Sequence, residues 1–487
     1  MSKIDRTTFH DLRSFLRYLR EQGELHEIDR QVDKSWELGT ICRENFDREG
    51  PALVFNRIDD YKTPLVVGVL GTLKRYAMAL GVPPKTGAFV EAWRRAYDNP
   101  IKPMKVQSAP CKEVKTTSID LFGDPFPIPI WHPLDAGPEL GTFHAVITKD
   151  PETGWINVGT YRNQILEKDK LGCLVIPYRH IGLHWHKWKK LGKPMPVAIA
   201  LGLDPYLSLV GVSAVPAEVH EYDIAGGLAG RPIEVVEAET SDLPVPANAE
   251  IVIEGLMPVD EFYPEEAPFG EFTGYMGTKR YNSHFIVVKC VIHRKEPYFQ
   301  GTYEGRPPSE STTTRSIGRS AAMLEHLKRA GVPGIVDVCV TPAGCAGFHT
   351  VVAIEKRYPG HVRDIFGHVW GQPTMFSKHV TVVDSDIDPW NPTQVEWAVS
   401  TRVQADRDVE IVKRGKSIVL DPSQVPSLRG WSALMGIDAT KPVDEYERDK
   451  TEPFPPTTDP KPDWLERVRA RWGEYGFADQ QVRREER

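Results

Sequence analysis

The stretch TFHAVITKD (142–150) opens a series of short β-rich segments that decides the fold of this chain. The later members are WINVGTYRNQIL (155–166), LGCLVIPY (171–178), PVAIALG (196–202), PIEVVEAE (232–239), AEIVIEG (249–255) and SHFIVVKCVIH (283–293). Turn residues separate these segments, and closely spaced strands of this kind are typical of a β-barrel or a β-sandwich. We therefore predict a β-rich central domain between Gly141 and Tyr303.

The chain on both sides of this series has the mixed pattern of α/β domains. Before it come predicted helices at 9–22 and 36–46, strand-like pieces at 51–55 and 63–71, and a proline-rich connection at 100–133. After it, predicted helices at 315–330 and 392–402 alternate with the strands GIVDVCV (334–340), FHTVVAIE (348–355), HVTVVDSD (379–386) and VEIVK (409–413).

The last segment begins at Pro462 and places four apolar residues on one helical face: Trp464, Leu465, Val468 and Trp472. We predict a helix docked on a neighbour, followed by a frayed charged tail, QQVRREER. The chain thus divides into an N-terminal α/β region (1–110), the central domain (111–312), a C-terminal α/β domain (313–460) and a terminal helix with its tail (461–487). The fold class is α/β (α+β).

Composition excludes several classes of protein. The 487 residues include 60 Lys and Arg against 67 Asp and Glu, a net charge of −7 that is spread along the chain. This argues against nucleic acid or an acidic membrane surface as the main partner. The first thirty residues lack the apolar run of a signal peptide, and no later window has the roughly 18 apolar residues of a membrane span. We expect a soluble, cytoplasmic protein with six buried, free cysteines.

The segment PEEAPFGEFTGY (264–275) places Glu266 and Glu271 on either side of a Pro-Phe-Gly turn. Two carboxyl groups on one turn can reach the same cavity, where their proton affinities separate and one of them can keep a proton near neutral pH. This is the arrangement of a general acid. The alternative is a solvated acidic turn, which is the commoner explanation for two glutamates at this spacing.

The segment NVGTYR (157–162) brings an amide, Asn157, and a guanidinium, Arg162, to a predicted strand and turn. The guanidinium of Arg162 can bind a carboxylate through two hydrogen bonds. An ordinary surface salt bridge explains the residue equally well.

Two further segments carry possible metal ligands. In PYRHIGLHWHKW (177–188), His180 and His184 have the spacing of residues on one helix face, although a single histidine ligand is more plausible than a zinc pair. In VPAEVHEYDIAGGLAG (215–230), Glu218, Glu221 and Asp223 lie where a helix is expected to begin, and composition alone does not distinguish them. Glycine-rich nucleotide cradles and serine-nucleophile motifs are absent from the sequence.

Four segments carry a family resemblance, in the chain order NVGTYR, PYRHIGLHWHKW, VPAEVHEYDIAGGLAG and PEEAPFGEFTGY, and WHPLDAGP (131–138) and GRPPSE (305–310) extend it. Together they resemble the UbiD family of decarboxylases over nearly the whole chain. The resemblance implies a prenylated flavin mononucleotide (prenylated FMN) as the cofactor, which performs the hard chemistry as an electron sink. It also implies a divalent metal, usually Mn²⁺, that bridges the cofactor phosphate to Asn157, His180 and Glu221, with K⁺ as a candidate second ion. It thereby selects Glu221 among its acidic neighbours.

The family's Glu-Arg-Glu trio falls on Arg162, Glu266 and Glu271, and the resemblance also places Arg162 among the residues that bind the cofactor. By resemblance, Arg162 orients the substrate carboxylate and holds Glu266 ionised, and Glu271 donates the proton that replaces the lost carboxyl group. Lys378 resembles the lysine that reaches the cofactor phosphate. Arg179 stands where some relatives have Gln, and it is expected at the substrate tail or the flavin edge. A second departure, Ala267 in place of the usual Gly, narrows the conformations of the turn.

The resemblance further implies a central split β-barrel that binds the flavin and a C-terminal domain used in dimerisation, so a homodimer or larger homo-oligomer is expected. A flavin prenyltransferase would supply the cofactor, and the substrate would be a small aromatic, heteroaromatic or α,β-unsaturated acid. Three alternatives stay open: a carboxylase running the same reaction in reverse, a split-barrel flavin redox protein, and a non-catalytic assembly or cofactor-storage subunit.

The stretches SESTTTRS (309–316) and SLRGWSALMG (427–436) are candidates for contact with the substrate. They include Arg315 and Trp431, and these side chains suggest a substrate that is a planar ring with a polar substituent or a heteroatom.

Overall fold

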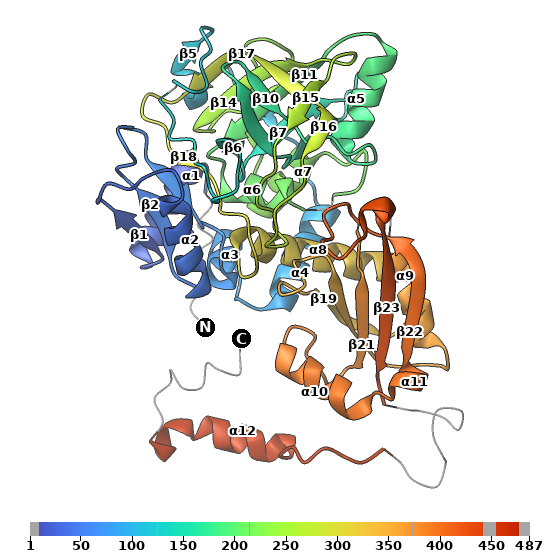
Figure 1. Cartoon of the computed structure of the whole chain (residues 1–487). Helices are drawn as coiled ribbons and strands as arrows, with labels where there is room; N and C mark the ends of the chain where they lie inside the picture. Colours follow the sequence, from blue (N-terminus) through green and yellow to red (C-terminus); the bar gives the residue numbers. More distant parts are fainter. Residues whose placement is uncertain (1–8, 124, 214, 373–374, 442–453, 477–487) are drawn as a thin grey trace.

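The chain folds into three α/β parts and a separate terminal helix, as a computed structural model shows (Figure 1). The structure describes residues 9–123, 125–213, 215–372, 375–441 and 454–476. The predicted charged tail (480–487) lies outside these residues. The N-terminal part contains α1 (Leu12–Glu21), β1 (Leu25–Ile28), α2 (Glu37–Asp47), β2 (Ala52–Phe55), β3 (Leu65–Val67), α3 (Leu73–Leu80) and α4 (Thr86–Asp98). Its sheet has the order β1-β2-β3-β18, in which β18 (Phe299–Gln300) returns from the central part.

The central part is built on a nine-stranded sheet, which matches the predicted β-rich series. Its order is β6-β9-β10-β17-β14-β11-β7-β8, and β5 pairs with β17. The strands are β5 (Val114–Thr116), β6 (Glu139–Gly141), β7 (Ala145–Lys149), β8 (Ile156–Gly159), β9 (Asn163–Glu167), β10 (Lys170–Gly172), β11 (Met195–Leu201), β14 (Ile251–Met257) and β17 (Phe285–His293). The pairings of the described strands do not close this path into a ring, so the split barrel stays a prediction.

One member of the predicted series lies outside this sheet. The segment PIEVVEAE forms β12 (Glu234–Glu237), which pairs with β13 (Pro244–Pro246) and β4 (Met104–Lys105) in a sheet of three strands. Its β-rich composition predicts a strand correctly, but composition does not say which sheet the strand joins. A two-stranded hairpin of β15 (Tyr263–Glu266) and β16 (Arg280–Ser283) completes the strands of this part.

The C-terminal part is an α/β sheet with the order β19-β20-β21-β23-β22. Its elements are α8 (Glu310–Arg329), β19 (Ile335–Val340), β20 (His349–Ile354), α9 (His361–Gly371), β21 (His379–Asp384), α10 (Pro392–Arg402), α11 (Ala405–Asp408), β22 (Val409–Lys416) and β23 (Trp431–Ala439). The sequence did not predict β23, which is inserted between β21 and β22, although Ser432, Leu434 and Gly436 alternate toward its buried side.

Helix α8 begins five residues before its predicted start, because the polar stretch SESTTTR forms its first turns. Ser309 and Thr312 form a reciprocal capping box, and the side chain of Glu310 is fully buried. The two carboxylate oxygens of Glu310 accept hydrogen bonds from the backbone N–H groups of Gly68 (2.9 Å) and Leu70 (2.8 Å). The buried polar residues of this stretch therefore join α8 to the N-terminal part, which their composition alone did not reveal.

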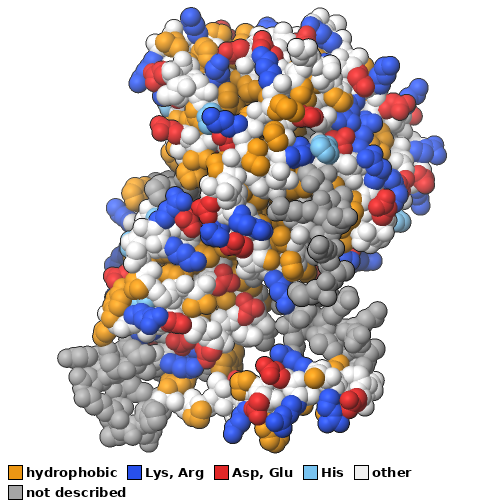
Figure 2. Space-filling model, turned by 180° about the vertical axis from the view of Figure 1, so that it is seen from behind, with side chains coloured by type: hydrophobic (Ala, Val, Ile, Leu, Met, Phe, Trp, Pro, Cys, Tyr) orange, Lys and Arg blue, Asp and Glu red, His pale blue; other side chains and the backbone are white. Residues whose placement is uncertain are grey.

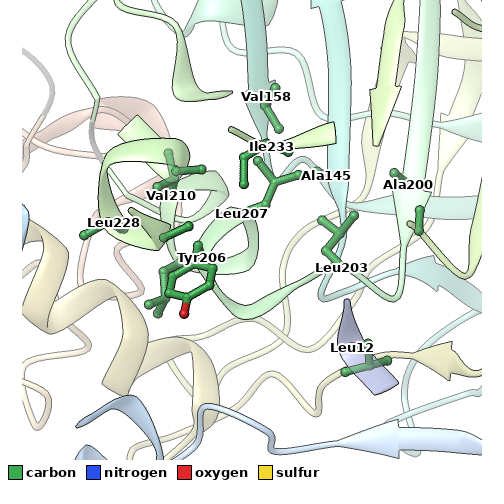
Figure 3. Close-up of a cluster of buried hydrophobic side chains, with 14 of the residues drawn as sticks. Leu12, Ala145, Val158, Ala200, Leu203, Tyr206, Leu207, Val210, Leu228 and Ile233 are labelled. Atoms are coloured by element: carbon green, nitrogen blue, oxygen red, sulfur yellow. The ribbon is translucent and has the colours of Figure 1, made fainter. Parts of the chain in front are cut away.

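A large hydrophobic cluster holds the N-terminal and central parts together (Figure 3). Leu12 of α1, Ala145 of β7 and Val158 of β8 are among its members. They pack with α6 (Pro205–Gly211), which contributes Tyr206, Leu207 and Val210, and with α7 (Glu221–Ala229), which contributes Leu228. Because β8 and α7 share this core, the residues at their ends have fixed positions.

The surface carries charges of both signs, interspersed over the face that Figure 2 shows. In the described part of the chain, no helix combines the length and the apolar character that crossing a membrane requires. All six cysteines are free, as predicted, and all except the half-buried Cys345 are buried.

The predicted terminal helix exists as α12 (Pro462–Ala470), and it lies apart from the three α/β parts in Figure 1. Two residues of its apolar face are exposed, Trp464 by 65% and Val468 by 38%. Docking of this face on a neighbour stays a prediction.

Candidate active site

One arginine joins two buried carboxyl groups at the centre of the site. Arg162 lies between β8 and β9, and its Nη1 donates to Glu139 Oε1 at 2.9 Å while its Nη2 donates to Glu266 Oε1 at 2.6 Å. Both glutamate side chains are fully buried, and the guanidinium lies 5.0 Å from the ring centre of Phe269. Burial alone would lower the pKa of Arg162, but Glu139, Glu266 and Glu271 raise it above its usual value. The guanidinium therefore stays charged.

A second arginine lies between the two glutamates that the sequence singled out. Strand pairing places Arg280 of β16 opposite Glu266 of β15. Its guanidinium nitrogens lie 3.8 Å from Glu266 Oε2 and 3.8 Å from Glu271 Oε1. Burial raises the pKa of Glu271, although Arg162 and Arg280 partly oppose it. Glu271 can therefore hold a proton closer to neutral pH than an exposed glutamate can.

The loop between Glu266 and Glu271 is fixed by the WHPLDAGP segment. Asp135 Oδ1 accepts a hydrogen bond from the Gly270 N–H at 2.9 Å, and its Oδ2 lies 2.9 Å from His132 Nδ1. His132 Nε2 in turn lies 2.6 Å from the carbonyl oxygen of Glu304. Glu266 ends strand β15 and Glu271 follows in the loop, so both side chains have supported positions rather than lying on a solvated turn.

The predicted metal ligands come from one strand, β8, which carries Asn157, and from two helix starts. His180 is the first residue of α5 (His180–Lys190), Glu221 is the first residue of α7, and the His180 Nδ1 lies 3.3 Å from Glu221 Oε1. Glu221 Oε2 accepts from the N–H of Val158, the residue after Asn157, at 3.1 Å. The His180 imidazole and the Glu221 carboxylate thus lie beside β8, the strand that carries Asn157. Among the described residues, no group of three or more His, Cys, Asp and Glu side chains could hold a metal.

His184 is not part of this group. Its Nδ1 lies 2.9 Å from Thr148 Oγ1, and its ring packs against Trp155 with the centres 4.7 Å apart. The Trp155 ring also contacts the His180 ring, with the centres 4.7 Å apart. The structure therefore gives no support to a zinc site made of the two histidines.

Three arginines, Arg179, Arg315 and Arg319, act on one another's charge in this region. Arg319 of α8 is buried, and its Nη1 donates to the carbonyl oxygen of Ala346 at 2.6 Å. Burial lowers the pKa of Arg319 far below its usual value, and the neighbouring charges that act on it, Arg315 and Arg179, lower it further. An anionic group would reduce the repulsion among these arginines, so the surroundings of Arg179 fit a phosphate.

The structure places Lys378 in the C-terminal part, where it is paired with Asp421 at 3.0 Å and lines a hollow of about 660 Å³. Trp431, the residue suggested for substrate contact, lines the same hollow. Arg315 acts on the charge of Glu271, and its Nη2 lies 2.9 Å from Glu304 Oε1. Of the two suggested substrate contacts, Arg315 is the one with an electrostatic effect on a member of the Glu-Arg-Glu trio among the described residues.

Sequence reasoning missed Glu139 and Arg280. Glu139 lies next to the quoted WHPLDAGP segment, in a short strand with no motif of its own, and Arg280 is distant in sequence from Glu266. The register of the β15–β16 hairpin could have revealed Arg280, because it makes the two residues cross-strand partners.

The fold and the site define a multidomain α/β enzyme in which buried acids surround one arginine. Three family models match consecutive parts of the chain: the N-terminal domain of 3-octaprenyl-4-hydroxybenzoate carboxy-lyase over residues 16–90, its Rift-related domain over 102–307 and its C-terminal domain over 312–439. The chain belongs to the UbiD family, and it is a UbiD-class carboxy-lyase with the three-domain architecture of that family.

Solved structures agree over almost the full length. The UbiD-class enzyme HmfF of Pelotomaculum thermopropionicum, in complex with FMN, is 34% identical with a TM-score of 0.83, covering 93% of this chain and 98% of its own. Vanillic acid decarboxylase of Sedimentibacter hydroxybenzoicus is 29% identical (TM-score 0.86; 95% and 99% covered). The 3,4-dihydroxybenzoic acid decarboxylase of Enterobacter cloacae is 27% identical (TM-score 0.81; 95% and 100% covered).

The fixed loop yields a prediction at Gly270. A methyl group on this residue would lie 2.4 Å from His132 Nδ1, so Gly270→Ala must displace either the His132 ring or the loop that carries Glu271. We expect turnover to fall by roughly 10²-fold, the cost of misplacing a catalytic group by about 1 Å, with flavin content retained. The control is Gly367→Ala in α9, where an added methyl meets no atom within 4 Å. Wild-type turnover in Gly270→Ala would contradict the role of this loop.

Proposed function

We propose that this enzyme removes carbon dioxide from an aromatic, heteroaromatic or α,β-unsaturated carboxylic acid with the help of prenylated FMN. The observation that carries the proposal is the state of Arg162. Two of its nitrogens are bound by buried carboxyl groups, while its Nε is buried and has no hydrogen-bond partner among the described residues. A rigid, charged guanidinium whose Nε–H is not used in a hydrogen bond is suited to bind one more anion, the carboxylate of a substrate.

The cofactor assignment is supported by the relatives and by the chemistry of the side chains. HmfF is known in complex with FMN, and an evolved dimeric form of it in complex with prenylated FMN. In this chain Asn157, His180 and Glu221 would hold Mn²⁺ or another divalent ion, with K⁺ as a candidate second ion, and Arg179 and Lys378 would face the phosphate. The bound cofactor supplies an electron sink for the bond that breaks.

The chain's own residues would bind and orient the acid and move one proton. Arg162 would hold the substrate carboxylate, and Glu266, through its 2.6 Å hydrogen bond, would keep the guanidinium in place. Glu271 would protonate the carbon that loses carbon dioxide, because burial raises its pKa and thus its proton occupancy near neutral pH. Each residue has one task, and no step requires a further acid.

The substrate is proposed to be a ring acid with a polar substituent. Two relatives are named for vanillic acid and 3,4-dihydroxybenzoic acid, both of which are substituted aromatic acids. In this chain Arg315 lies 4.6 Å from the ring centre of Phe272, so a cation and an aromatic face are available together near Glu271.

The assembly and the domain roles belong to the same proposal. The central domain (111–312), with its expected split barrel, would bind the flavin, and the C-terminal domain (313–460) would join two copies into a cytoplasmic homodimer or larger oligomer. The N-terminal region (1–110) is tied to the central domain by the shared hydrophobic core. A flavin prenyltransferase would supply the cofactor.

Replacing the proposed acid tests the reaction directly. In Glu271→Gln we expect metal and flavin to be retained and turnover to fall by about 10² to 10⁴, because an amide cannot supply the proton. The measurement uses protein made together with a flavin prenyltransferase and screened against aromatic acids. It also follows exchange of the product's ring hydrogen in deuterated buffer, which needs the proton donor but not the loss of carbon dioxide. Exchange as fast as in the wild type would show that another group is the acid.

Replacing a proposed metal ligand tests cofactor binding. Glu221→Ala and His180→Ala should lose both Mn²⁺ and flavin, because the phosphate dianion would lose the ion that compensates its charge. Asn157→Ala should lose less, since an amide oxygen contributes no net charge. Metal analysis and flavin absorbance of the purified variants decide this. A Glu221→Ala protein with full flavin occupancy after removal of metal would contradict the assignment.

A further inference from the structure

A third carboxyl group, that of Glu139, is part of the Arg162 site. It is the first residue of β6, its side chain is fully buried, and strand pairing places it opposite Gln164 of β9. Its Oε1 accepts hydrogen bonds from Arg162 Nη1 at 2.9 Å and from Gln164 Nε2 at 2.8 Å. The strand pairing, rather than a flexible loop, therefore determines the distance between Glu139 and the guanidinium.

The buried charges around Glu139 do not balance. The cations that act on this group are Arg162, Arg280 and Arg315, whereas the acids are Glu139, Glu266, Glu271 and Glu304, with Asp135 also near Glu139. If every acid were ionised, three positive charges would face at least four negative ones in a desolvated site. If these buried acids share one bound proton, the excess of negative charge is reduced.

Glu139 is well placed to hold that proton. Its Oε2 is buried and has no hydrogen-bond partner among the described residues, an expensive position for a charged oxygen and a cheaper one for a neutral acid. Burial, together with the charges of Asp135 and Glu266, raises the pKa of Glu139 to about 8, even though Arg162 lowers it.

We propose that Glu139 is a positioning residue that binds Arg162 as a neutral carboxylic acid, so that the guanidinium charge is available to Glu266 and to the substrate carboxylate. The inference rests on the proposed function. Because the pKa of Glu139 is raised, the neutral acid is present below about pH 8 and is lost as the pH rises through that value. The ionised Glu139 then competes with the substrate for the charge of Arg162, and substrate binding weakens.

Infrared spectroscopy tests the protonation without relying on activity. Between roughly one unit below and one unit above this pKa, the wild-type protein should lose the carbonyl band of a protonated carboxyl group. Glu139→Gln should lack that change. The control is Glu167→Gln, the same chemical replacement at a half-buried residue of β9 that pairs with Lys170. This variant should keep the pH-dependent change of the band. A wild-type protein with no titrating carboxyl band would overturn the proposal even if the variant failed to fold, and so would an unaltered band in Glu139→Gln.

Kinetics tests the consequence for the substrate. Above its pKa, each further pH unit should raise the wild-type KM about tenfold, because only the protein with neutral Glu139 binds the acid well. In Glu139→Gln the KM should no longer depend on pH in this range, while Glu167→Gln should follow the wild type. An equal rise of KM in Glu139→Gln would assign the effect to another group and overturn the proposal. A wild-type protein that decarboxylates no acid would instead contradict the proposed function, and the infrared result would still decide the state of Glu139.

Discussion

A single buried guanidinium organises the centre of this molecule. Arg162 binds Glu139 from β6 and Glu266 from β15, two carboxyl groups that are more than one hundred residues apart in sequence. Removing such groups from water is costly unless they are paired in good geometry. Strands β6 and β15 and the β8–β9 connection that carries Arg162 must therefore meet with little freedom, and this requirement fixes the positions of the side chains around the site before any ligand is bound.

The rest of the fold supplies that rigidity. The core that Val158 shares with α6 and α7 places the N–H of Val158 against Glu221, so the same packing supports the proposed metal ligands. On the other side, Asp135 ties the loop before Glu271 through the N–H of Gly270. Glu310 joins α8 to the N-terminal part by accepting two buried backbone hydrogen bonds, each of which would cost about 1–3 kcal/mol if left unmade.

Much of this arrangement could be predicted from the sequence, because it depends on local patterns. The helical and β-rich segments gave the three α/β parts, and the PEEAPFGE and NVGTYR segments pointed to Glu266, Glu271 and Arg162. Long-range pairing could not be predicted in the same way: β23 is inserted between β21 and β22, and β12 leaves the large sheet. Glu139 and Arg280 have no motif, and only strand register brings them to the site.

The central claim is that Arg162 recognises the substrate carboxylate through the planar geometry that its two carboxyl partners impose. The most direct test is the dissociation constant of a substrate acid, measured by cofactor absorbance in the wild type and in Arg162→Lys. This variant keeps the positive charge but lacks the planar guanidinium. We expect Arg162→Lys to bind the acid more weakly by roughly tenfold or more, which is about 1.4 kcal/mol, with unchanged flavin content. Equal affinity in the two proteins would contradict it.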